Sequence, residues 1–305
     1  MSVQETAEKI SSMEIRGAGK IARAAAEALK NFILQSEEND PVKLIDALSE
    51  ASDTLLNTRP TAVSLANALA AVLAGAKGAT VDEIRANVTK AAEQFILNSI
   101  QAIDRIAEIC SSIIIENGNT IMTHCNSTVV VKSIIKAHNH RKQIRVYATE
   151  TRPWRQGFIT AQALADAGVD ITLIVDSAAC FFMAETDLVL IGADTITAAG
   201  TVYNKIGTSQ IAICAHEKHV PVFVCAETYK ILNSTMDDDS VKIEERDSTE
   251  VVEQDKLPGV KIRNPVFDAT PPNYINGIVT EQGIISPSEV VKILTKKQPN
   301  NGAKN

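Results

Sequence analysis

The stretch Asn117-Gly118-Asn119-Thr120-Ile121-Met122-Thr123 marks the point where the residue pattern of the chain changes. Turn-forming residues end a long helical pattern here, and a short run with β propensity begins. Four more such runs follow at intervals of roughly 20 to 35 residues, with helical stretches between them. They are Ile144-Arg145-Val146-Tyr147, Ile171-Thr172-Leu173-Ile174-Val175, Leu188-Val189-Leu190-Ile191 and 220–224. This alternation predicts βαβ units and a mostly parallel, Rossmann-like sheet.

Before this point the pattern is helical. Residues 21–29 are rich in alanine, and apolar residues recur at spacings of three and four through residues 81–114. Asp40-Pro41 and Thr80 resemble helix starts, since proline is tolerated in a first turn and threonine can cap one. We therefore predict an α/β protein with a helical N-terminal domain, residues 1–116, and a Rossmann-like C-terminal domain, residues 117–305.

The composition is that of an ordinary globular protein. Of the 305 residues, 45% are hydrophobic and 22% are charged, which suits two folded domains. No stretch approaches the roughly 18 uninterrupted apolar residues of a membrane span. The start Met1-Ser2-Val3-Gln4-Glu5 lacks the basic and apolar regions of a signal peptide. We therefore expect a cytoplasmic protein with no membrane partner.

The five cysteines are Cys110, Cys125, Cys180, Cys214 and Cys225. They are odd in number, widely spaced and mostly embedded in apolar runs, and no CxxC pair suggests zinc or a redox couple. This pattern predicts reduced core thiols and no metal site.

The formal net charge of −7 argues against nonspecific binding of nucleic acid, which needs a cationic surface. A small anionic ligand remains compatible, because a few arginines and lysines in a cleft can oppose the overall sign. Nine acidic residues lie in segment 237–255, against Lys242 and Arg246. We expect this segment to be a solvated excursion on the surface.

Three motifs that carry reactive groups each follow an apolar run. They are Thr123-His124-Cys125-Asn126-Ser127, Gly192-Ala193-Asp194 and Asn204-Lys205-Ile206-Gly207. In a parallel α/β sheet, the residues just after a strand lie at the mouth of a ligand crevice. A thiol, a carboxylate and an ammonium would then converge on one small-molecule site. Since none of these groups is easily buried without a partner, their positions favour chemistry over packing.

Two other motifs do not carry the function that they first suggest. Arg16-Gly17-Ala18-Gly19-Lys20 is not a P-loop, because no Ser or Thr follows Lys20 and no strand precedes the glycines. It is either a generic anion site at a helix start, beside Arg16, or an ordinary glycine turn. We do not expect His124 to activate Cys125 directly, since neighbours on a strand point to opposite faces.

Residues 16–290 resemble a superfamily that unites the α, β and δ regulatory subunits of eukaryotic initiation factor 2B with two sugar-phosphate isomerases. These isomerases act on methylthioribose 1-phosphate and on ribose 1,5-bisphosphate. The matching motifs are Arg16-Gly17-Ala18-Gly19, Arg59-Pro60-Thr61, the Cys125 motif, Glu150-Thr151-Arg152-Pro153 with Gln156-Gly157, the Asp194 motif, Asn204-Lys205-Ile206-Gly207-Thr208 and Ala226-Glu227-Thr228-Tyr229-Lys230. The family fold, a helical domain followed by a Rossmann-like domain, agrees with the pattern above.

Within this family, a few side chains favour one branch. The regulatory subunits commonly lack the cysteine and the aspartate that this chain has as Cys125 and Asp194, so the resemblance implies an enzyme. The glycine at Gly19 and the residues after Asn126 match the ribose-1,5-bisphosphate isomerase better than the methylthioribose enzyme. The implied reaction is the aldose-ketose isomerisation of ribose 1,5-bisphosphate to ribulose 1,5-bisphosphate in AMP and nucleotide salvage. A noncatalytic regulatory subunit and a methylthioribose-1-phosphate isomerase are the alternatives.

The resemblance also implies roles for single residues. Cys125 would be the proton acceptor, which requires cationic or N–H neighbours to lower the pKa of its thiol. Asp194 would be the proton donor, which requires an apolar surround that raises the pKa of its carboxyl. The implied substrate-binding residues are Arg16, Gly17, Ala18, Gly19, Arg59, Ser127, Arg152, Gln156, Asn204, Lys205 and Lys230. Arg152 has an alternative role, which is to brace the turn between a strand and a helix.

The implied reaction needs an acid and a base but no cofactor. For partners, the resemblance implies a homo-oligomer built from dimers, with a hexamer as one form and a nucleotide activator as one alternative.

Overall fold

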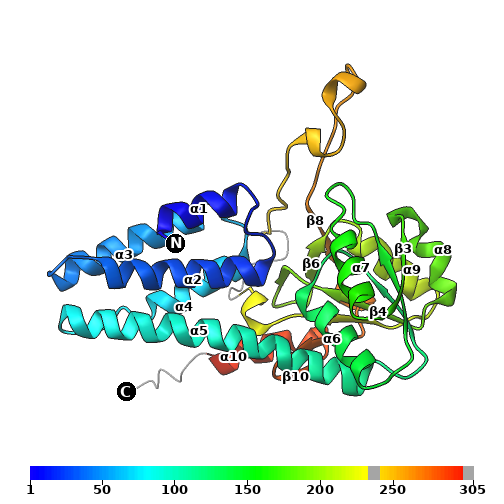
Figure 1. Ribbon diagram of the computed structural model, residues 1–305, viewed down its shortest axis with the longest axis horizontal. Coiled ribbons are helices and arrows are strands. Elements are labelled where there is room, and N and C mark those ends of the chain that lie inside the picture. The colour runs from blue at the N-terminus through cyan, green and yellow to red at the C-terminus, as the bar shows by residue number, and fades with distance from the viewer. Residues whose placement is uncertain (233–240, 298–305) are drawn as a thin grey trace. The chain divides into compact units, whose positions relative to one another are not determined.

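The computed structural model describes residues 1–232 and 241–297 (Figure 1). The chain folds into two compact units, Met1–Ala102 and Ile103–Asn305, and each has its own apolar core. The division between the units falls inside helix α5 (Val81–Ile109). The domain boundary after residue 116 stays a prediction.

Unit 1 contains α1 (Val3–Ser11), α2 (Ala18–Gln35), α3 (Pro41–Leu56), α4 (Val63–Leu73) and the first part of α5. The sequence signals explain where these helices begin. Asp40 caps α3 by accepting hydrogen bonds from the N–H groups of Val42 and Lys43, with Pro41 in the first turn. Leu29, Leu44 and other apolar side chains at helical spacing form the core. The prediction of a helical N-terminal region is confirmed.

Unit 2 is built around a seven-stranded sheet with the order β10-β9-β7-β4-β1-β2-β3. All neighbours are parallel except β10 and β9. The strands are β1 (Thr120–Thr123), β2 (Arg145–Thr149), β3 (Asp170–Ile174), β4 (Leu188–Gly192), β7 (Val222–Cys225), β9 (Gly277–Thr280) and β10 (Gly283–Ile285). All five predicted runs are strands of this sheet, which confirms the α/β fold class. β9 and β10 were not predicted.

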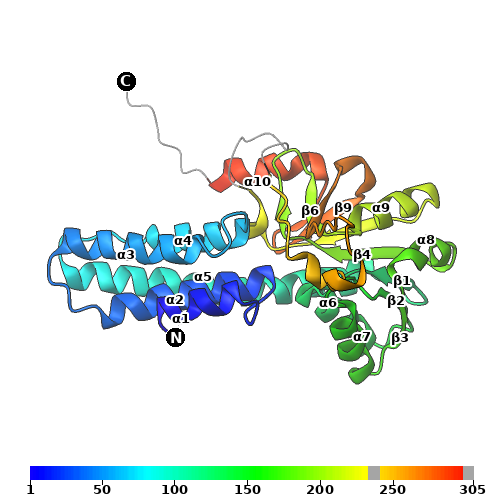
Figure 2. The ribbon, with the colours of Figure 1, turned by 90° about the horizontal axis from the view of Figure 1, so that it is seen from above.

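Helices cover both faces of the sheet (Figure 2). Because strand residues alternate between faces, Leu190 packs on the side of α6 (Thr128–Asn139) and α7 (Gly157–Asp166). Ile191 packs on the opposite side, against α8 (Ala179–Phe182), α9 (Thr208–Glu217) and α10 (Val290–Lys297). No helix in the described part of the chain has the length and apolar character that a membrane crossing requires.

A smaller antiparallel sheet consists of β5 (Thr195–Ile196), β6 (Val202–Lys205) and β8 (Phe267–Thr270), in that order. β5 and β6 follow β4 directly in the chain, whereas β8 comes after β7. β6 pairs with both β5 and β8, and Lys205, the last residue of β6, lies opposite Phe267 of β8. The small sheet was not predicted, because its strands are too short to show a periodic pattern.

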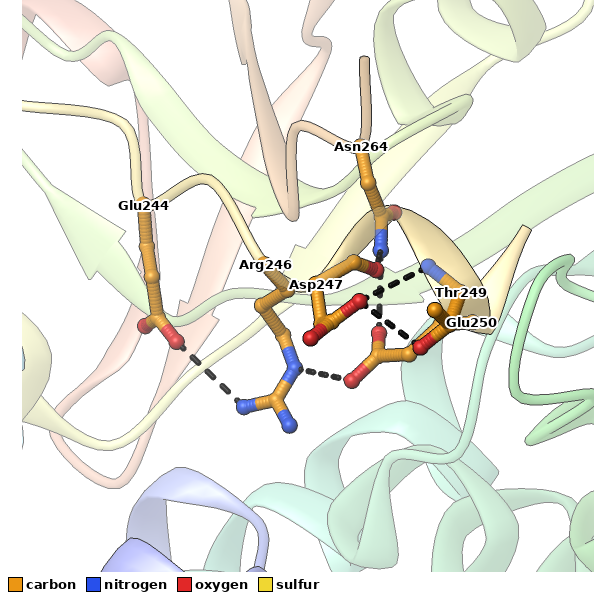
Figure 3. A network of polar contacts seen from close by, with 6 residues as sticks. All are labelled: Glu244, Arg246, Asp247, Thr249, Glu250 and Asn264. Atoms are coloured by element: carbon orange, nitrogen blue, oxygen red, sulfur yellow. Dashed lines mark hydrogen bonds and ion pairs between the residues drawn. The ribbon is translucent and has the colours of Figure 1, made fainter. Parts of the chain in front are cut away.

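Residues 244–264, which we call the arm, project from unit 2 between β7 and β8 (Figure 1). The two sides of the arm are joined at its base by a polar network (Figure 3). The Glu250 carboxylate accepts hydrogen bonds from Arg246 Nε at 2.8 Å and from Asn264 Nδ2 at 3.0 Å. The described residues 241–255 are exposed or half-buried, so the predicted surface position is confirmed for them. Asp237, Asp238 and Asp239 lie outside the described residues.

The prediction that all five cysteines are reduced is wrong, because Cys180 and Cys214 form a disulfide. The two residues are 34 positions apart in sequence, and their Cα atoms come within 5.3 Å where α8 packs against α9. Sequence spacing carries no information about this packing. Cys110, Cys125 and Cys225 are free thiols, and the Sγ atoms of Cys110 and Cys225 lie 3.3 Å apart in the core.

We expect denatured protein to show three reactive thiols without a reductant and all five after reduction. Cys214→Ala should lower the free energy of unfolding by about 3 to 4 kcal/mol, because the crosslink that closes this loop is lost. Chemical denaturation under non-reducing conditions measures the change. Reduction should destabilise the parent chain but have little further effect on Cys214→Ala. Five reactive thiols without reductant would contradict the crosslink.

Candidate active site

The candidate site lies at the carboxyl ends of β1 and β4. These strands are hydrogen-bonded neighbours, with Ile121 opposite Leu188 and Met122 opposite Val189. The chain leaves β1 toward β2 and β3 on one side, and leaves β4 toward β7 and β9 on the other. Such a reversal of strand order opens a crevice at the carboxyl ends of the two strands, where α/β proteins bind ligands.

Cys125 follows β1 by two residues and is held in a left-handed backbone conformation, with φ of 65°. Its backbone N–H donates to Thr151 Oγ1 at 2.9 Å. Its thiol donates to Gln156 Oε1 at 3.4 Å. Thr151 and Gln156 both belong to the loop between β2 and α7, so this loop contacts Cys125 at both its backbone and its sulfur.

The surroundings of Cys125 favour the neutral thiol. Burial raises the pKa of Cys125 to about 11, although the Lys205 ammonium and the Asn126 N–H act to lower it. The carboxylates of Asp194 and Asp176 raise this pKa further. The cation expected beside the thiol is therefore present, but its effect is smaller than that of burial. The expected depression of the Cys125 pKa is not found.

Asp194 follows β4 by two residues, as Cys125 follows β1. Its backbone N–H donates to the carbonyl of Tyr203 at 3.0 Å, which ties it to β6. The residues on either side, Ala193 and Thr195, are buried, whereas Asp194 itself is half-buried. Its charge raises the pKa of Cys125 and also that of Lys230. The structure thus places Asp194 within electrostatic reach of both groups.

Asn204 and Lys205 end β6 and are positioned by the turn that follows. The buried Asn204 side chain donates to Thr208 Oγ1 at 2.9 Å. The Lys205 ammonium lies 5.2 Å from the centre of the Phe267 ring, a cation–π contact that leaves its charge unneutralised. Gly207 adopts a φ of 102°, and a Cβ there would come within 3.2 Å of the His124 ring. The turn therefore requires glycine for its conformation and for this close approach.

Lys230 is buried in an ion pair with Glu227, at 2.8 Å from Nζ to Oε2. Burial by itself would lower the pKa of Lys230, but the Glu227 carboxylate outweighs it and the pKa is raised. Burial would likewise raise the pKa of Glu227, but Lys230 keeps it lowered. Both groups therefore stay charged. Glu227 was not predicted as a functional residue, although its position three residues before Lys230 is a signal for such a pair.

His124 is buried and its two ring nitrogens are engaged away from the thiol. Nε2 lies 2.9 Å from the carbonyl of Ile206, and Nδ1 lies 2.5 Å from Thr149 Oγ1. A carbonyl can only accept, so Nε2 carries the proton. Burial lowers the pKa of His124, so the ring is neutral and Nδ1 accepts from the Thr149 hydroxyl. The prediction that His124 does not pair directly with Cys125 agrees with these contacts.

The remaining predicted residues of unit 2 lie around the same strand ends. Ser127 begins α6 and closely approaches Gly192, where an added Cβ would meet Ser127 Oγ at 2.7 Å. Arg152 is exposed, and its guanidinium donates to the carbonyl of Val251 in the arm at 2.8 Å. This contact ties the loop between β2 and α7 to the arm, and both roles considered for Arg152 stay predictions.

The predicted residues of unit 1 gather at one end of that unit. Gly17 precedes α2 with φ of 88°, and Ala18 and Gly19 form the first turn of the helix. The Ser64 hydroxyl, near the start of α4, donates to the Ala18 carbonyl at 3.2 Å. The turn that contains Arg59 immediately precedes α4, with Ala62 N–H donating to the Arg59 carbonyl. Arg16 and Arg59 therefore lie near the paired starts of α2 and α4.

Comparison with known proteins agrees with this architecture. The model of the Initiation factor 2 subunit family matches residues 14–287, and the chain belongs to this family. It is 46% identical to the ribose 1,5-bisphosphate isomerase of Methanocaldococcus jannaschii, covering 96% of this chain and 94% of that protein. It is 36% identical to the methylthioribose-1-phosphate isomerase of Geobacter metallireducens, covering 97% and 90%. The crystal structure of the Pyrococcus horikoshii OT3 translation initiation factor eIF-2B matches with a TM-score of 0.83 and 31% identity, covering 95% and 98%.

Lys205→Met should slow the alkylation of Cys125 by iodoacetamide at pH 9 by ~3- to 10-fold, because removing the ammonium raises the thiol pKa further. Peptide mass spectrometry measures modification at Cys125 alone. Lys218→Met, in the exposed turn after α9, is the matched control and should leave the rate unchanged. Equal rates for the two variants would show that Lys205 does not act on the thiol.

Proposed function

We propose that this chain is an isomerase that converts ribose 1,5-bisphosphate to ribulose 1,5-bisphosphate. The observation that carries the proposal is the placement of a thiol, Cys125, and a carboxylate, Asp194, after the two strands of the switch point. An aldose-ketose isomerisation needs one group that takes a proton and one that gives a proton, and no cofactor. The relatives named ribose 1,5-bisphosphate isomerase are 42% to 48% identical to this chain, against 36% for those named methylthioribose-1-phosphate isomerase.

The reaction moves one hydrogen from C2 of the sugar to C1. Asp194 donates a proton to the ring oxygen as its bond to C1 breaks. The Cys125 thiolate then takes the proton from C2, and the electron pair of that C–H bond forms a double bond between C1 and C2. Finally the protonated Cys125 returns a proton to C1, and the C2 hydroxyl gives its proton to Asp194 and becomes the ketone, which restores both groups. The number of protons and electrons in the substrate is unchanged.

The high pKa of Cys125 opposes this role in the free protein, so we propose that the thiolate forms by transfer of its proton to Asp194. In the resting state the thiol is neutral and Asp194 acts on it as a carboxylate. Moving the proton from Cys125 to Asp194 produces the thiolate and the carboxylic acid that the reaction needs, with one negative charge before and after. The carboxylate that opposed the thiolate then becomes neutral, and the nearby Lys205 ammonium favours the new charge.

Charged and polar side chains are proposed to bind the phosphates. Lys205, Asn204 and Ser127 lie at the same strand ends as Cys125, which supports contacts with the sugar and one phosphate. Lys230 is already paired with Glu227, so a phosphate would have to share its charge with that carboxylate. The phosphate-binding roles of Arg16, Arg59 and the Gly17–Gly19 turn follow from the family resemblance.

A sugar phosphate is the proposed partner, and a homo-oligomer the proposed assembly. A structural neighbour from C. thermophilum, matched at 18% identity, is titled as a tetrameric complex, and at that identity only the fold is shared. The dimer-based assembly, the nucleotide activator and the cytoplasmic location stay predictions.

The first test follows ketose formation from ribose 1,5-bisphosphate by the purified chain. Cys125→Ser should lower kcat by at least ~10²-fold, because a hydroxyl is a far weaker proton acceptor than a thiolate. Substrate affinity, measured by calorimetry, should change little. Cys110→Ser, which changes a buried thiol at the start of the helical turn Cys110–Ile114, should keep the parental kcat. A parent chain that forms no ribulose 1,5-bisphosphate would remove the proposed function.

The second test concerns the proton donor. Asp194→Asn keeps the shape of the side chain but cannot supply the proton, so kcat should fall by ~10² to 10⁴-fold. Affinity should hold or improve, because a negative charge is removed near an anionic substrate. Steady-state kinetics combined with calorimetry separates the two effects. A variant with full kcat and weakened binding would make Asp194 a substrate-binding group instead.

A further inference from the structure

The backbone of Cys125 is held by side chains on both sides. A left-handed conformation is uncommon for a residue with a side chain and persists only where the surroundings enforce it. The Cys125 N–H donates to Thr151 Oγ1 at 2.9 Å, and the Cys125 carbonyl accepts from the Thr160 hydroxyl at 2.8 Å. The direction in which the thiol points therefore depends on where Thr151 and Thr160 are held.

Thr151 has the same unusual backbone conformation as Cys125. It is buried, and its own φ is 63°. Its N–H donates to Asp176 Oδ1 at 2.7 Å, and the N–H of Arg152 donates to Asp176 Oδ2 at 2.7 Å. One carboxylate thus accepts from two successive backbone N–H groups. An asparagine has only one accepting oxygen and could not replace both contacts.

Asp176 reaches this turn because of the sheet. It follows β3 and begins a short 3-10 helix, Asp176–Ala178. β3 pairs in parallel with β2, with Thr149 opposite Ile174, and the N–H of Glu150 donates to the Ile174 carbonyl at 2.8 Å. The residues after β2 and β3 therefore lie side by side at the carboxyl ends of these strands, the same end of the sheet at which β1 ends.

We propose that Asp176 is a positioning residue for Cys125, which acts through Thr151 to fix the backbone and hence the direction of the thiol. The Asp176 carboxylate bonds to the backbone of the loop after β2 and not to the Cys125 sulfur. The proposal deepens the proposed function and rests on it, because it assigns the group that aims the proton acceptor.

Asp176 also affects the charge at Cys125, and this gives a readout that a purely structural role would not move. The charged groups that act on the thiol are Lys205 after β6, Asp194 after β4 and Asp176 after β3. His124, the preceding residue, is neutral because burial lowers its pKa. Removing the Asp176 charge should therefore favour the Cys125 thiolate. Losing the hydrogen bonds that Asp176 accepts should change the direction in which the Cys125 thiol points.

The test compares Asp176→Asn with the parent chain. We expect kcat to fall by ~10- to 100-fold, because small misplacements of a reacting group are costly, while KM stays within about threefold. The midpoint of the pH dependence of Cys125 alkylation should move to lower pH. A thiol that ionises more readily but turns over more slowly is the signature of a positioning role.

Asp187→Asn is the matched control. Asp187 Oδ2 likewise accepts a backbone N–H, from Thr120 at 2.8 Å, but at the amino ends of β1 and β4. This variant should change neither the kcat nor the alkylation midpoint. If Asp176→Asn retains the parental kcat, or if both variants behave alike, the proposal is overturned.

A second pair of variants decides the matter if Asp176→Asn does not fold. Thr151→Ala removes the oxygen that accepts from Cys125, whereas Thr151→Ser keeps it. The alanine variant should lose turnover by ~10-fold or more and the serine variant should recover most of it; equal loss in both would overturn the proposal. The alkylation measurement needs no isomerase activity. A parent chain that is inactive on ribose 1,5-bisphosphate would therefore refute the proposed function, whereas an active parent chain with unchanged turnover in Asp176→Asn would refute only the role of Asp176.

Discussion

The parallel pairing of β1 with β4 is the constraint on which the rest of the site depends. Because the chain leaves these two strands in opposite directions, their carboxyl ends form a switch point of the kind where α/β proteins bind ligands. Cys125 and Asp194 each follow by two residues, so a fixed register in the sheet becomes a fixed relation between a thiol and a carboxylate. Leu190 and Ile191 anchor β4 in the cores on both faces of the sheet, which makes that register expensive to shift.

The site brings two lysines and several carboxylates into a poorly solvated region. The two lysines differ in how closely a carboxylate contacts them. Lys230 and Glu227 form a closed pair. Lys205, in contrast, faces an aromatic ring, so its field acts on Cys125 rather than on a carboxylate in direct contact. This difference separates a lysine that maintains the structure from one that can respond to a negative charge formed during a reaction.

Backbone geometry contributes as much as charge. Cys125 and Thr151 both adopt left-handed conformations, and each is stabilised by a hydrogen bond from its N–H to a side chain of a neighbouring segment. Gly207 meets a similar demand with a residue that has no side chain. Three turns that follow three different strands are thereby interlocked around the thiol. Loops joined in this way can hold a reactive group as rigidly as a strand does.

The sequence by itself determined the local elements and indicated candidates for the reactive groups. Apolar spacing of three and four identified the helices of unit 1, and the β-rich runs identified five parallel strands, because these patterns reflect which side of an element is buried. Cys125, Asp194 and Lys205 stood out because each follows an apolar run, at a position where ligands bind and where such groups are not easily buried without a partner. The family motifs pointed to the same residues.

Only the tertiary structure decided which distant residues meet. The Cys180–Cys214 disulfide depends on the packing of α8 on α9, and the contact of Asp176 with Thr151 depends on the register of β3 on β2. The direction of the Cys125 pKa shift was misjudged from sequence because burial sets it, and burial depends on everything packed around the sulfur. Periodicity records whether a residue faces the core, but the depth of that core and the neighbours found there are fixed only when separate segments pack together.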